Sequence, residues 1–562
     1  MANSNVFTVS DYILTRLYEL GLRKMYAVPG DYAAPFLDAL DGFEGIERVA
    51  NINELGSGYA ADGYARFTGI GAACIQYGVG TFSMLNTVAG SYVERVPVVA
   101  ITGSPTRKNR KTTRQEGVLF HHSTGDLRAD KEVYEHVTVG SIIIGNARNA
   151  PKQIDRVLVS MITEKRPVYI EVWQNVWTLP CDPPVGTLMP KEQRSEQLSL
   201  ASAVETAWQR IAKAKLPVIW AGVEIQRYGL QDTLQQLVDN SGFPFTTTSL
   251  GKTVLDESQP QFIGTYAGPA SLELTSEIVD KSDCIIALGD VITDDYLDIM
   301  GNDYGKIILS TDQEMRVGYQ FFKEVTMKDF LESLVGRMMA DADYPRQIDY
   351  PRVPLIPAHS KIKNSDDLTY NIFFDVLMDY LRDEDMTDEI EMILGESTSL
   401  YVAGNIMGLP QNGFVAQAAW GSLGHETGCA LGVAQGSGKR PLVVAGDGGF
   451  HMICQEMSSL SQAGVNAMVF VMSNHVYAIE QAFVDLDAFT PDGSFAPYDI
   501  LPKWDYKALA KAYHVEGYKI KTVADLKDVM KRLKNETKPA LIEVEISDKD
   551  LAPQLKRLAT GG

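Results

Sequence analysis

Cysteine is scarce in this sequence, and the cysteines present are not spaced as a metal site or a redox pair. Five are scattered along 562 residues, with no C-x-x-C pair and no histidine at a ligand spacing. An odd, scattered set argues against a disulfide framework of the kind that stabilises small secreted domains. We therefore expect a protein of a reducing compartment, the cytoplasm.

Long apolar runs and excess positive charge are also absent. No stretch approaches the roughly 18 uninterrupted apolar residues of a membrane-spanning helix, and the first residues lack the basic and apolar regions of a secretory signal. The chain has 51 Lys and Arg against 72 Asp and Glu, a net charge of −21. Such a chain repels nucleic acid and anionic membranes, so we expect no binding to either. A diphosphate ligand would need a metal ion to be held.

The composition is that of an ordinary globular protein, with 45% hydrophobic and 22% charged residues. Its length predicts about three to four domains. Proline-containing polar stretches near residues 183–196 and 344–357 are typical of linkers. We therefore predict domains at 1–185, 195–345 and 360–562.

The most informative stretch runs from Gly446 to Glu480. A strand-length apolar run, 441–445, ends on the sequence GDGG, and a second run, 467–472, ends on Ser-Asn. Between them, apolar residues recur at helical spacing from about Phe450, and Gly464 follows where a helix would stop. The pattern predicts a strand–loop–helix–strand unit of a parallel sheet.

This unit delivers Asp447 and Asn474 to neighbouring loops at the carboxyl ends of two strands, where open α/β sheets bind ligands. Gly448 and Gly449 allow backbone N–H groups to approach a diphosphate, helped by the positive end of the following helix. A carboxylate and an amide oxygen suit magnesium. A GDG triplet alone is weak evidence, but Asn474 follows Asp447 by 27 residues with strands on both sides, which is much stronger.

Strand runs alternate with helical patterns in the other domains as well, so the predicted fold class is α/β with three doubly wound parallel-sheet domains. In the first domain, one predicted strand delivers Asp31 to its carboxyl-end loop and another delivers Glu54. Small residues after Glu54 suggest a helix packed closely against another backbone. The adjacent pair His121-His122 lies in a predicted loop, and both can face one ligand only if the backbone there is irregular.

The middle domain shows no G-x-G-x-x-G after any of its predicted strands. The missing motif argues against nucleotide binding by the middle domain, and we favour a structural or regulatory role for it. Whether this domain binds an effector stays open.

Several motifs occur together along nearly the whole chain: Gly30–Tyr32 (GDY), Asn53–Arg66 (NELGSGYAADGYAR), His121-His122, Trp420–Gly424 (WGSLG), GDG from Gly446, and Asn474 with Glu480. In this order they resemble the thiamine-diphosphate-dependent 2-oxo-acid decarboxylases, which act on pyruvate, indolepyruvate or branched-chain 2-oxo acids.

The resemblance implies a role for each matching residue. Asp447, Asn474 and the Val476 carbonyl would bind magnesium. The cofactor would contact Glu54, Gly421, Leu423, Asp447, Gly448, Gly449, Asn474, Val476, Tyr477 and Ile479, with Leu423 bending it. The catalytic set would be Asp31, Glu54, His121, His122 and Glu480.

These implied roles agree with simple acid–base chemistry. A carboxylate at Glu54, beside the pyrimidine ring, favours the tautomer in which the cofactor supplies its own base. The other members of the set can relay protons to the product, and crowded carboxylates raise one pKa toward neutrality. In this family the first domain of one subunit meets the third domain of another. We therefore expect a homodimer or homotetramer with shared active sites.

The residues around the expected substrate depart from the family pattern. Glu396 replaces a common Thr or Gln, Leu400 replaces a large aromatic of pyruvate-specific relatives, and Phe483 adds an aromatic beyond Glu480. A charged Glu396 selects a polar or cationic substrate, or it is satisfied by backbone N–H groups, and the sequence leaves both open. It also leaves open which 2-oxo acid is used. His475 follows Asn474 at a position where the family usually has an aromatic or small polar residue, and we expect no metal role for it.

Two other functions compete with decarboxylation to an aldehyde. A carboligase of the acetolactate-synthase type shares the Glu54 and Asp447 motifs but typically lacks a double histidine and a glutamate six residues after the liganding Asn474. Glu480 is present at that spacing. A binding protein without turnover is the third alternative, and the intact set of titratable residues argues against it.

Overall fold

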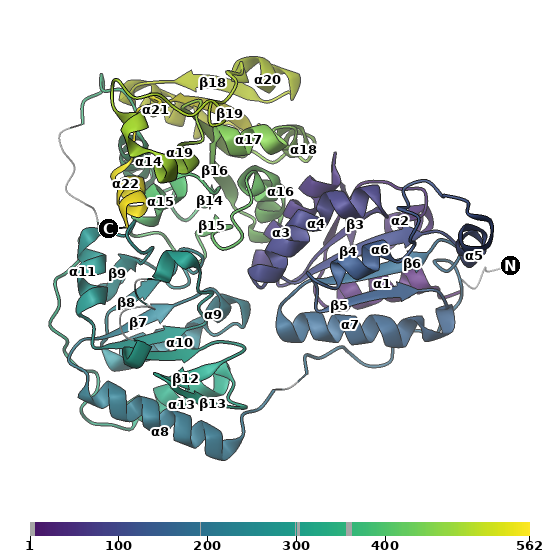
Figure 1. Ribbon diagram of the computed structural model, residues 1–562, viewed down its shortest axis with the longest axis horizontal. Coiled ribbons are helices and arrows are strands. Elements are labelled where there is room, and N and C mark those ends of the chain that lie inside the picture. Colours follow the sequence, from purple (N-terminus) through teal and green to yellow (C-terminus); the bar gives the residue numbers. More distant parts are fainter. Residues whose placement is uncertain (1–5, 192, 298, 300–303, 356–361, 562) are drawn as a thin grey trace. The chain divides into compact units, whose positions relative to one another are not determined.

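The structure is a computed structural model that describes residues 6–191, 193–297, 299, 304–355 and 362–561 (Figure 1). The chain forms two compact units. The first contains the residues up to 192 with segments 427–439 and 453–465, and the second contains the remainder.

The first unit contains a six-stranded parallel sheet. Its order is β2 (Glu47–Ala50), β1 (Lys24–Ala27), β3 (Gly71–Gln76), β4 (Val98–Ser104), β6 (Val168–Trp173), β5 (Gly140–Ile144). From β1 the chain goes to β2 on one side and later to β3 on the other, so the strand order reverses there. The loops after β1 and β3 therefore flank the crevice that such a switch point creates.

Helices connect these strands. They are α1 (Val9–Glu19), α2 (Ala34–Asp41), α3 (Glu54–Thr68), α4 (Val79–Val93), α5 (Arg107–Glu116), α6 (Ala129–Tyr134) and α7 (Ala150–Glu164). A capping box at Thr8 and Asp11 starts α1. Helices α1, α2 and α7 form one contacting group, and α3, α4 and α6 form another.

Small residues on α3 permit very close packing, as expected. A Cβ atom on Gly63 would lie 2.5 Å from the Cys429 carbonyl oxygen, in a segment that belongs to the same unit. A Cβ atom on Gly432 of that segment would lie 1.8 Å from the Ala60 carbonyl oxygen. No side chain fits at either position, so the glycines are a packing requirement.

The second unit contains two sheets, of which the first has seven strands. Its order is β13 (Gln320–Phe322), β12 (Met315–Val317), β11 (Ile307–Ser310), β10 (Cys284–Leu288), β7 (Pro217–Ala221), β8 (Phe245–Thr247), β9 (Phe262–Thr265). Strands β7 to β11 are parallel, whereas β12 and β13 add an antiparallel edge. Its helices are α8 (Gln197–Lys213), α9 (Glu224–Arg227), α10 (Gln231–Ser241), α11 (Glu273–Lys281) and α13 (Met327–Met339).

The other sheet of this unit has six parallel strands. Its order is β15 (Phe414–Ala416), β14 (Ile390–Leu394), β16 (Arg440–Gly446), β17 (Met468–Ser473), β19 (Ala540–Glu545), β18 (Glu516–Ile520). The chain leaves β14 toward β15 on one side and returns to β16 on the other. This second switch point lies between β14 and β16, and their carboxyl-end loops flank it.

The α-helices described within residues 362–561 are α14 (Tyr370–Asp383), α15 (Thr398–Gly404), α16 (His425–Ser437), α17 (Asp447–Ile453), α18 (Glu456–Gln462), α19 (Ala478–Val484), α20 (Tyr506–Ala512), α21 (Val523–Leu533) and α22 (Pro553–Thr560). Of these, α18 and residues 427–437 of α16 belong to the first unit. Pro553 is the first residue of α22, a position where proline is favoured.

The predicted single helix from Phe450 to Gly464 is wrong in detail. The helix begins three residues earlier, at Asp447, and is broken at residues 454–455 into α17 and α18. Both helices bury an apolar face, so the apolar periodicity continues across the break. The sequence pattern alone therefore does not reveal the break.

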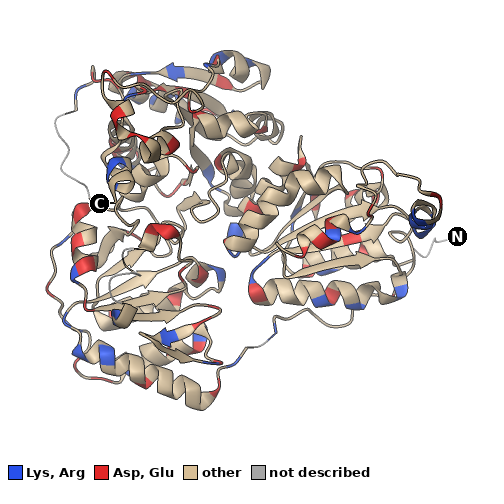
Figure 2. Cartoon of the chain, in the orientation of Figure 1, with Lys and Arg blue, Asp and Glu red and all other residues tan. Residues whose placement is uncertain are grey.

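Charged residues are spread over both units, and α5 is conspicuously basic (Figure 2). Within the described residues, none of the helices combines the length and the apolar character needed to cross a membrane.

Candidate functional site

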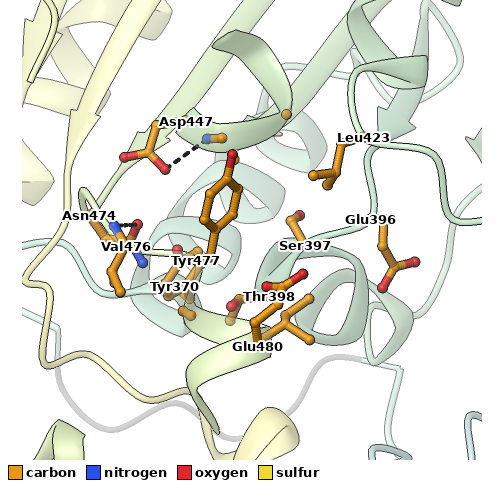
Figure 3. Close-up of a pocket in the computed structure, with 15 residues that line it drawn as sticks. Tyr370, Glu396, Ser397, Thr398, Leu423, Asp447, Asn474, Val476, Tyr477 and Glu480 are labelled. Atoms are coloured by element: carbon orange, nitrogen blue, oxygen red, sulfur yellow. Dashed lines mark hydrogen bonds between the residues drawn. The ribbon is translucent and has the colours of Figure 1, made fainter. Parts of the chain in front are cut away.

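A cavity of about 100 Å³ opens at the switch point between β14 and β16 (Figure 3). Most of its lining comes from the segments that directly follow β14, β16 and β17, joined by Tyr370 at the start of α14 and Leu423 in the loop before α16. Residues far apart in sequence meet there because parallel strands end at one edge of the sheet. The cavity is lined by Tyr370, Glu396, Ser397, Thr398, Leu423, Gly446, Asp447, Gly448, Gly449, Asn474, Val476, Tyr477, Ala478, Ile479 and Glu480.

Asp447 begins α17 and is almost completely buried, with 2% of its surface exposed. Its Oδ2 accepts a hydrogen bond of 2.7 Å from the His475 N–H, and its Oδ1 accepts one of 3.0 Å from the Gly448 N–H. Burial raises the pKa of Asp447 from 3.8 to about 7, although these backbone N–H groups lower it. A carboxylate this deeply buried is stabilised in its charged form by a nearby cation.

Asn474 and Val476 complete the predicted metal-ligand set on the loop after β17. Both are buried, and the Asn474 Oδ1 accepts a hydrogen bond of 3.3 Å from the Val476 N–H. Among the described residues there is no group of three or more His, Cys, Asp or Glu arranged around a common metal position. A cation at this place would therefore be held by one carboxylate together with amide and carbonyl oxygens, the donor set that suits magnesium.

Gly448 and Gly449, in the first turn of α17, leave room that a side chain would fill. A Cβ atom on Gly448 would lie 2.3 Å from the Tyr477 ring, and one on Gly449 would lie 2.9 Å from the Glu426 Oε1. Across the cavity, Thr398 at the start of α15 is buried, and its hydroxyl has no hydrogen-bond partner. A buried, unsatisfied hydroxyl in a cavity that is also lined by glycines fits a ligand that accepts hydrogen bonds, such as a diphosphate.

Four lining residues were not found from the sequence: Tyr370, Ser397, Thr398 and Ala478. A signal existed for two of them, since Gly395-Glu396-Ser397-Thr398 follows a strand-length run at 391–394, just as GDGG follows the run at 441–445. Tyr370 comes from the start of α14, and nothing in its sequence neighbourhood connects it with the other loops.

Some of the remaining predicted residues of this unit line the cavity, and others do not. Leu423 lines the cavity, and Gly421 has a positive φ of 65° in the loop before α16. Glu480 lies in the first turn of α19 and lines the cavity too. Leu400 is buried in the hydrophobic core, and Phe483 is 56% exposed, and neither lines this cavity.

The other predicted catalytic residues belong to the first unit. Asp31 follows β1, and its Oδ1 accepts a hydrogen bond of 2.6 Å from the Gln76 Nε2 at the end of β3. Glu54 is the first residue of α3, and its Oε1 lies 3.2 Å from where a Cβ on Gly80 would stand. The structure therefore brings these two carboxylates to the switch point of the first sheet.

The histidine pair lies in the loop after α5, and both side chains are exposed. His122 has a positive φ of 68°, which is the irregular backbone that the adjacent pair requires. The ring centroids of His121 and His122 are 6.3 Å apart, and the His122 ring lies 6.0 Å from that of Tyr77. Tyr77 in turn donates a hydrogen bond to the His121 carbonyl oxygen, which fixes the loop.

Comparisons with known proteins agree along the chain. Three family models of thiamine pyrophosphate enzymes match it: the N-terminal TPP binding domain at residues 7–127, the central domain at 204–328 and the C-terminal TPP binding domain at 397–544. Pyruvate decarboxylase 1 from Zea mays is 30% identical, over 96% of this chain and 87% of the relative. An alpha-keto-acid decarboxylase from Mycobacterium leprae is 31% identical, over 96% and 93%.

A solved structure supports the same fold. It belongs to a protein from Mycobacterium smegmatis that its describers assigned to the thiamin diphosphate-dependent enzymes. The TM-score is 0.76 at 19% identity, and the match covers 96% of this chain and 99% of the other.

Proposed function

Because the chain belongs to the thiamine-diphosphate-dependent 2-oxo-acid decarboxylases, we propose that it converts a 2-oxo acid into an aldehyde and carbon dioxide without oxidation. When bound, the cofactor supplies an electron sink for the carbon–carbon bond that breaks. The observation that carries the proposal is the cavity at the β14/β16 switch point, which is lined by Asp447, Asn474 and the glycines at the start of α17.

This chain's residues would hold the cofactor through its diphosphate. Asp447, Asn474 and the Val476 carbonyl would bind magnesium, and Gly448 and Gly449 would contact the phosphate oxygens. The unsatisfied Thr398 hydroxyl and the raised pKa of Asp447, caused by burial, support this placement. The family resemblance further assigns contacts with the cofactor to Gly421, Leu423, Tyr477 and Ile479.

Proton transfer would fall to residues of both units. Glu54 would hold a proton at the pyrimidine ring. Apolar surroundings would strengthen the interaction between its carboxylate and the ring. Asp31, His121, His122 and Glu480 would deliver the proton that the product carbon requires. The contacts between Asp31 and Gln76 and between His122 and Tyr77 support this role because they bring a carboxylate and an imidazole to loops of one sheet.

We further propose that the active enzyme is a cytoplasmic homodimer or homotetramer. In that assembly the first unit of one copy supplies Glu54 to the Asp447 cavity of another. The domain division 1–185, 195–345 and 360–562 is part of the same proposal, and Glu396, which lines the cavity, belongs to its substrate pocket.

A carboligase of the acetolactate-synthase type is the alternative. The exposed histidine pair and Glu480 at the cavity favour decarboxylation over ligation, because they supply the protons that release of an aldehyde consumes.

Product identification by NMR tests the proposal. The purified protein is incubated with thiamine diphosphate, Mg²⁺ and, in turn, pyruvate, a branched-chain 2-oxo acid, phenylpyruvate and indolepyruvate. We expect an aldehyde and carbon dioxide in equal amounts from at least one of them. Hydroxyketones as the sole products would establish the carboligase instead, and no product from any acid would refute both.

A further inference from the structure

Tyr370 lines the cavity, and the proposed function gives it no role (Figure 3). It is the first residue of α14, which begins after Thr369, whose side chain caps the helix by accepting a hydrogen bond from the Ile372 N–H. The Tyr370 N–H donates a hydrogen bond of 2.8 Å to the Asp550 Oδ2. The start of the helix is therefore fixed, and so is the position from which the tyrosine side chain extends.

The Tyr370 hydroxyl is a hydrogen-bonding group without a partner in the protein. The residue is only 4% exposed, yet its hydroxyl forms no hydrogen bond with any residue that the structure describes. Thr398 is near enough to lower the pKa of Tyr370, but the Thr398 hydroxyl is itself unpartnered, so the two hydroxyls do not bond to each other. A buried tyrosine usually has a partner, and two unpartnered hydroxyls in one cavity indicate a ligand that accepts from both.

This hydroxyl remains a proton donor over the physiological pH range. Burial, followed by the negative charge of Asp447, raises the pKa of Tyr370. The phenol is therefore neutral, and it adds no negative charge to the cavity. Because the effect of a charge falls off with distance, the phenol lies in the neighbourhood of Asp447, the proposed metal ligand. It is placed where a metal-bound anion would be held.

The described lining of the cavity contains no Lys, Arg or His. A metal ion can balance the charge of a diphosphate there, but the remaining phosphate oxygens need neutral donors. Among the lining hydroxyls, that of Ser397 already donates a hydrogen bond of 3.1 Å to the Gly395 carbonyl oxygen. Tyr477 is partly exposed, so its hydroxyl can bond to water. Tyr370 and Thr398 are therefore the buried hydroxyls that are left for a ligand.

From this position, and on the basis of the proposed function, we propose that the Tyr370 hydroxyl donates a hydrogen bond to the diphosphate of the bound cofactor. Tyr370 and Thr398 then supply neutral donors, and the metal ion supplies the positive charge. The contact holds the cofactor and takes no part in bond breaking. Its loss therefore affects cofactor affinity and the stability of the loaded protein, and it leaves turnover at saturating cofactor unchanged.

The variant Tyr370→Phe removes the hydroxyl and keeps the ring. In fluorescence titrations with saturating Mg²⁺, we expect it to bind thiamine diphosphate about tenfold more weakly than the wild type, because one hydrogen bond to a charged group is lost. Inorganic diphosphate, which lacks the thiamine part and is measured by competition, should lose affinity by a similar factor. Tyr380→Phe is the matched control, since Tyr380 is partly exposed about 15 Å further along α14, and it should keep the wild-type affinity for both ligands.

Thermal unfolding and turnover give two further readouts. Without metal and cofactor the hydroxyl is buried and unpartnered, so Tyr370→Phe should melt at the wild-type temperature or above it. The gain in melting temperature on adding thiamine diphosphate and Mg²⁺ should be smaller for Tyr370→Phe than for the wild type at the same ligand concentration, because the variant binds less tightly. At saturating cofactor, kcat should stay within about twofold of the wild-type value.

Several outcomes would overturn the proposal. Unchanged affinity of Tyr370→Phe for thiamine diphosphate would do so directly, and a loss that inorganic diphosphate does not share would place the hydroxyl against another part of the cofactor. A cofactor-free variant that melts well below the wild type would show that the hydroxyl has a partner in the protein. A strongly reduced kcat with wild-type affinity would make Tyr370 part of the reaction itself. Failure of the wild type to bind thiamine diphosphate would instead refute the proposed function.

Discussion

The buried carboxyl of Asp447 gives a prediction about stability that is independent of turnover. Its pKa is about 7 in the folded, metal-free protein and 3.8 without burial, because burial disfavours the charged form. The folded state therefore binds the proton more tightly, and its stability falls as pH rises from about 4 to 7. The full shift corresponds to about 4 kcal/mol, of which about 3 kcal/mol falls between pH 5 and pH 8.

The variant Asp447→Asn removes this titration with little change of shape. An asparagine offers one oxygen to the two backbone N–H groups of His475 and Gly448, so one bond is lost at a cost of roughly 1–3 kcal/mol. That cost does not depend on pH. We expect the stability of the variant relative to the wild type to improve by about 3 kcal/mol from pH 5 to pH 8.

Thermal or urea unfolding of the metal-free and cofactor-free proteins at both pH values measures this difference. Other buried carboxyls, such as Glu426 and Glu456, also have pKa values raised to about 7 by burial, but they are common to both proteins and cancel. Mg²⁺ with thiamine diphosphate at pH 8 should stabilise the wild type and not the variant. If the difference in stability between the variant and the wild type is the same at pH 5 and pH 8, the raised pKa assigned to Asp447 is refuted.

Three further substitutions test the proposed roles. Glu54→Gln should reduce decarboxylation at least 100-fold while thiamine diphosphate still binds by fluorescence titration, and a near-normal rate would contradict the proton role. Glu480→Gln should lower kcat about 100-fold with the cofactor retained, and an unchanged kcat would remove Glu480 from the relay. Thr398→Val should leave the fold intact by circular dichroism and weaken thiamine diphosphate binding about tenfold, since one hydrogen bond to a charged group is lost, whereas unchanged binding would place the diphosphate elsewhere.

The sequence predicts the centre of the site because two local rules coincide there. Asp447 and Asn474 each follow a buried apolar run, and the carboxyl ends of neighbouring parallel strands must meet. Both residues line the cavity, which the strand order alone places between β14 and β16. Local pattern and sheet topology are sufficient for these residues.

Other features depend on information that local patterns do not carry. The break between α17 and α18 leaves the apolar periodicity intact, and the antiparallel hairpin of β12 and β13 consists of strands of three residues each. Leu400 follows the same loop as Thr398, yet it enters the core while Thr398 faces the cavity, since successive residues of α15 point in different directions. Only the three-dimensional packing of α15 distinguishes them.

Dependence of carbon dioxide release on the two cofactors tests the central claim most directly. The protein is dialysed against EDTA until metal and thiamine diphosphate are removed, and carbon dioxide release from its best 2-oxo acid is then measured. We predict no release after dialysis, none with either component alone and full recovery with thiamine diphosphate and Mg²⁺ together. Release that persists after complete removal, or that does not return with both, would contradict the account.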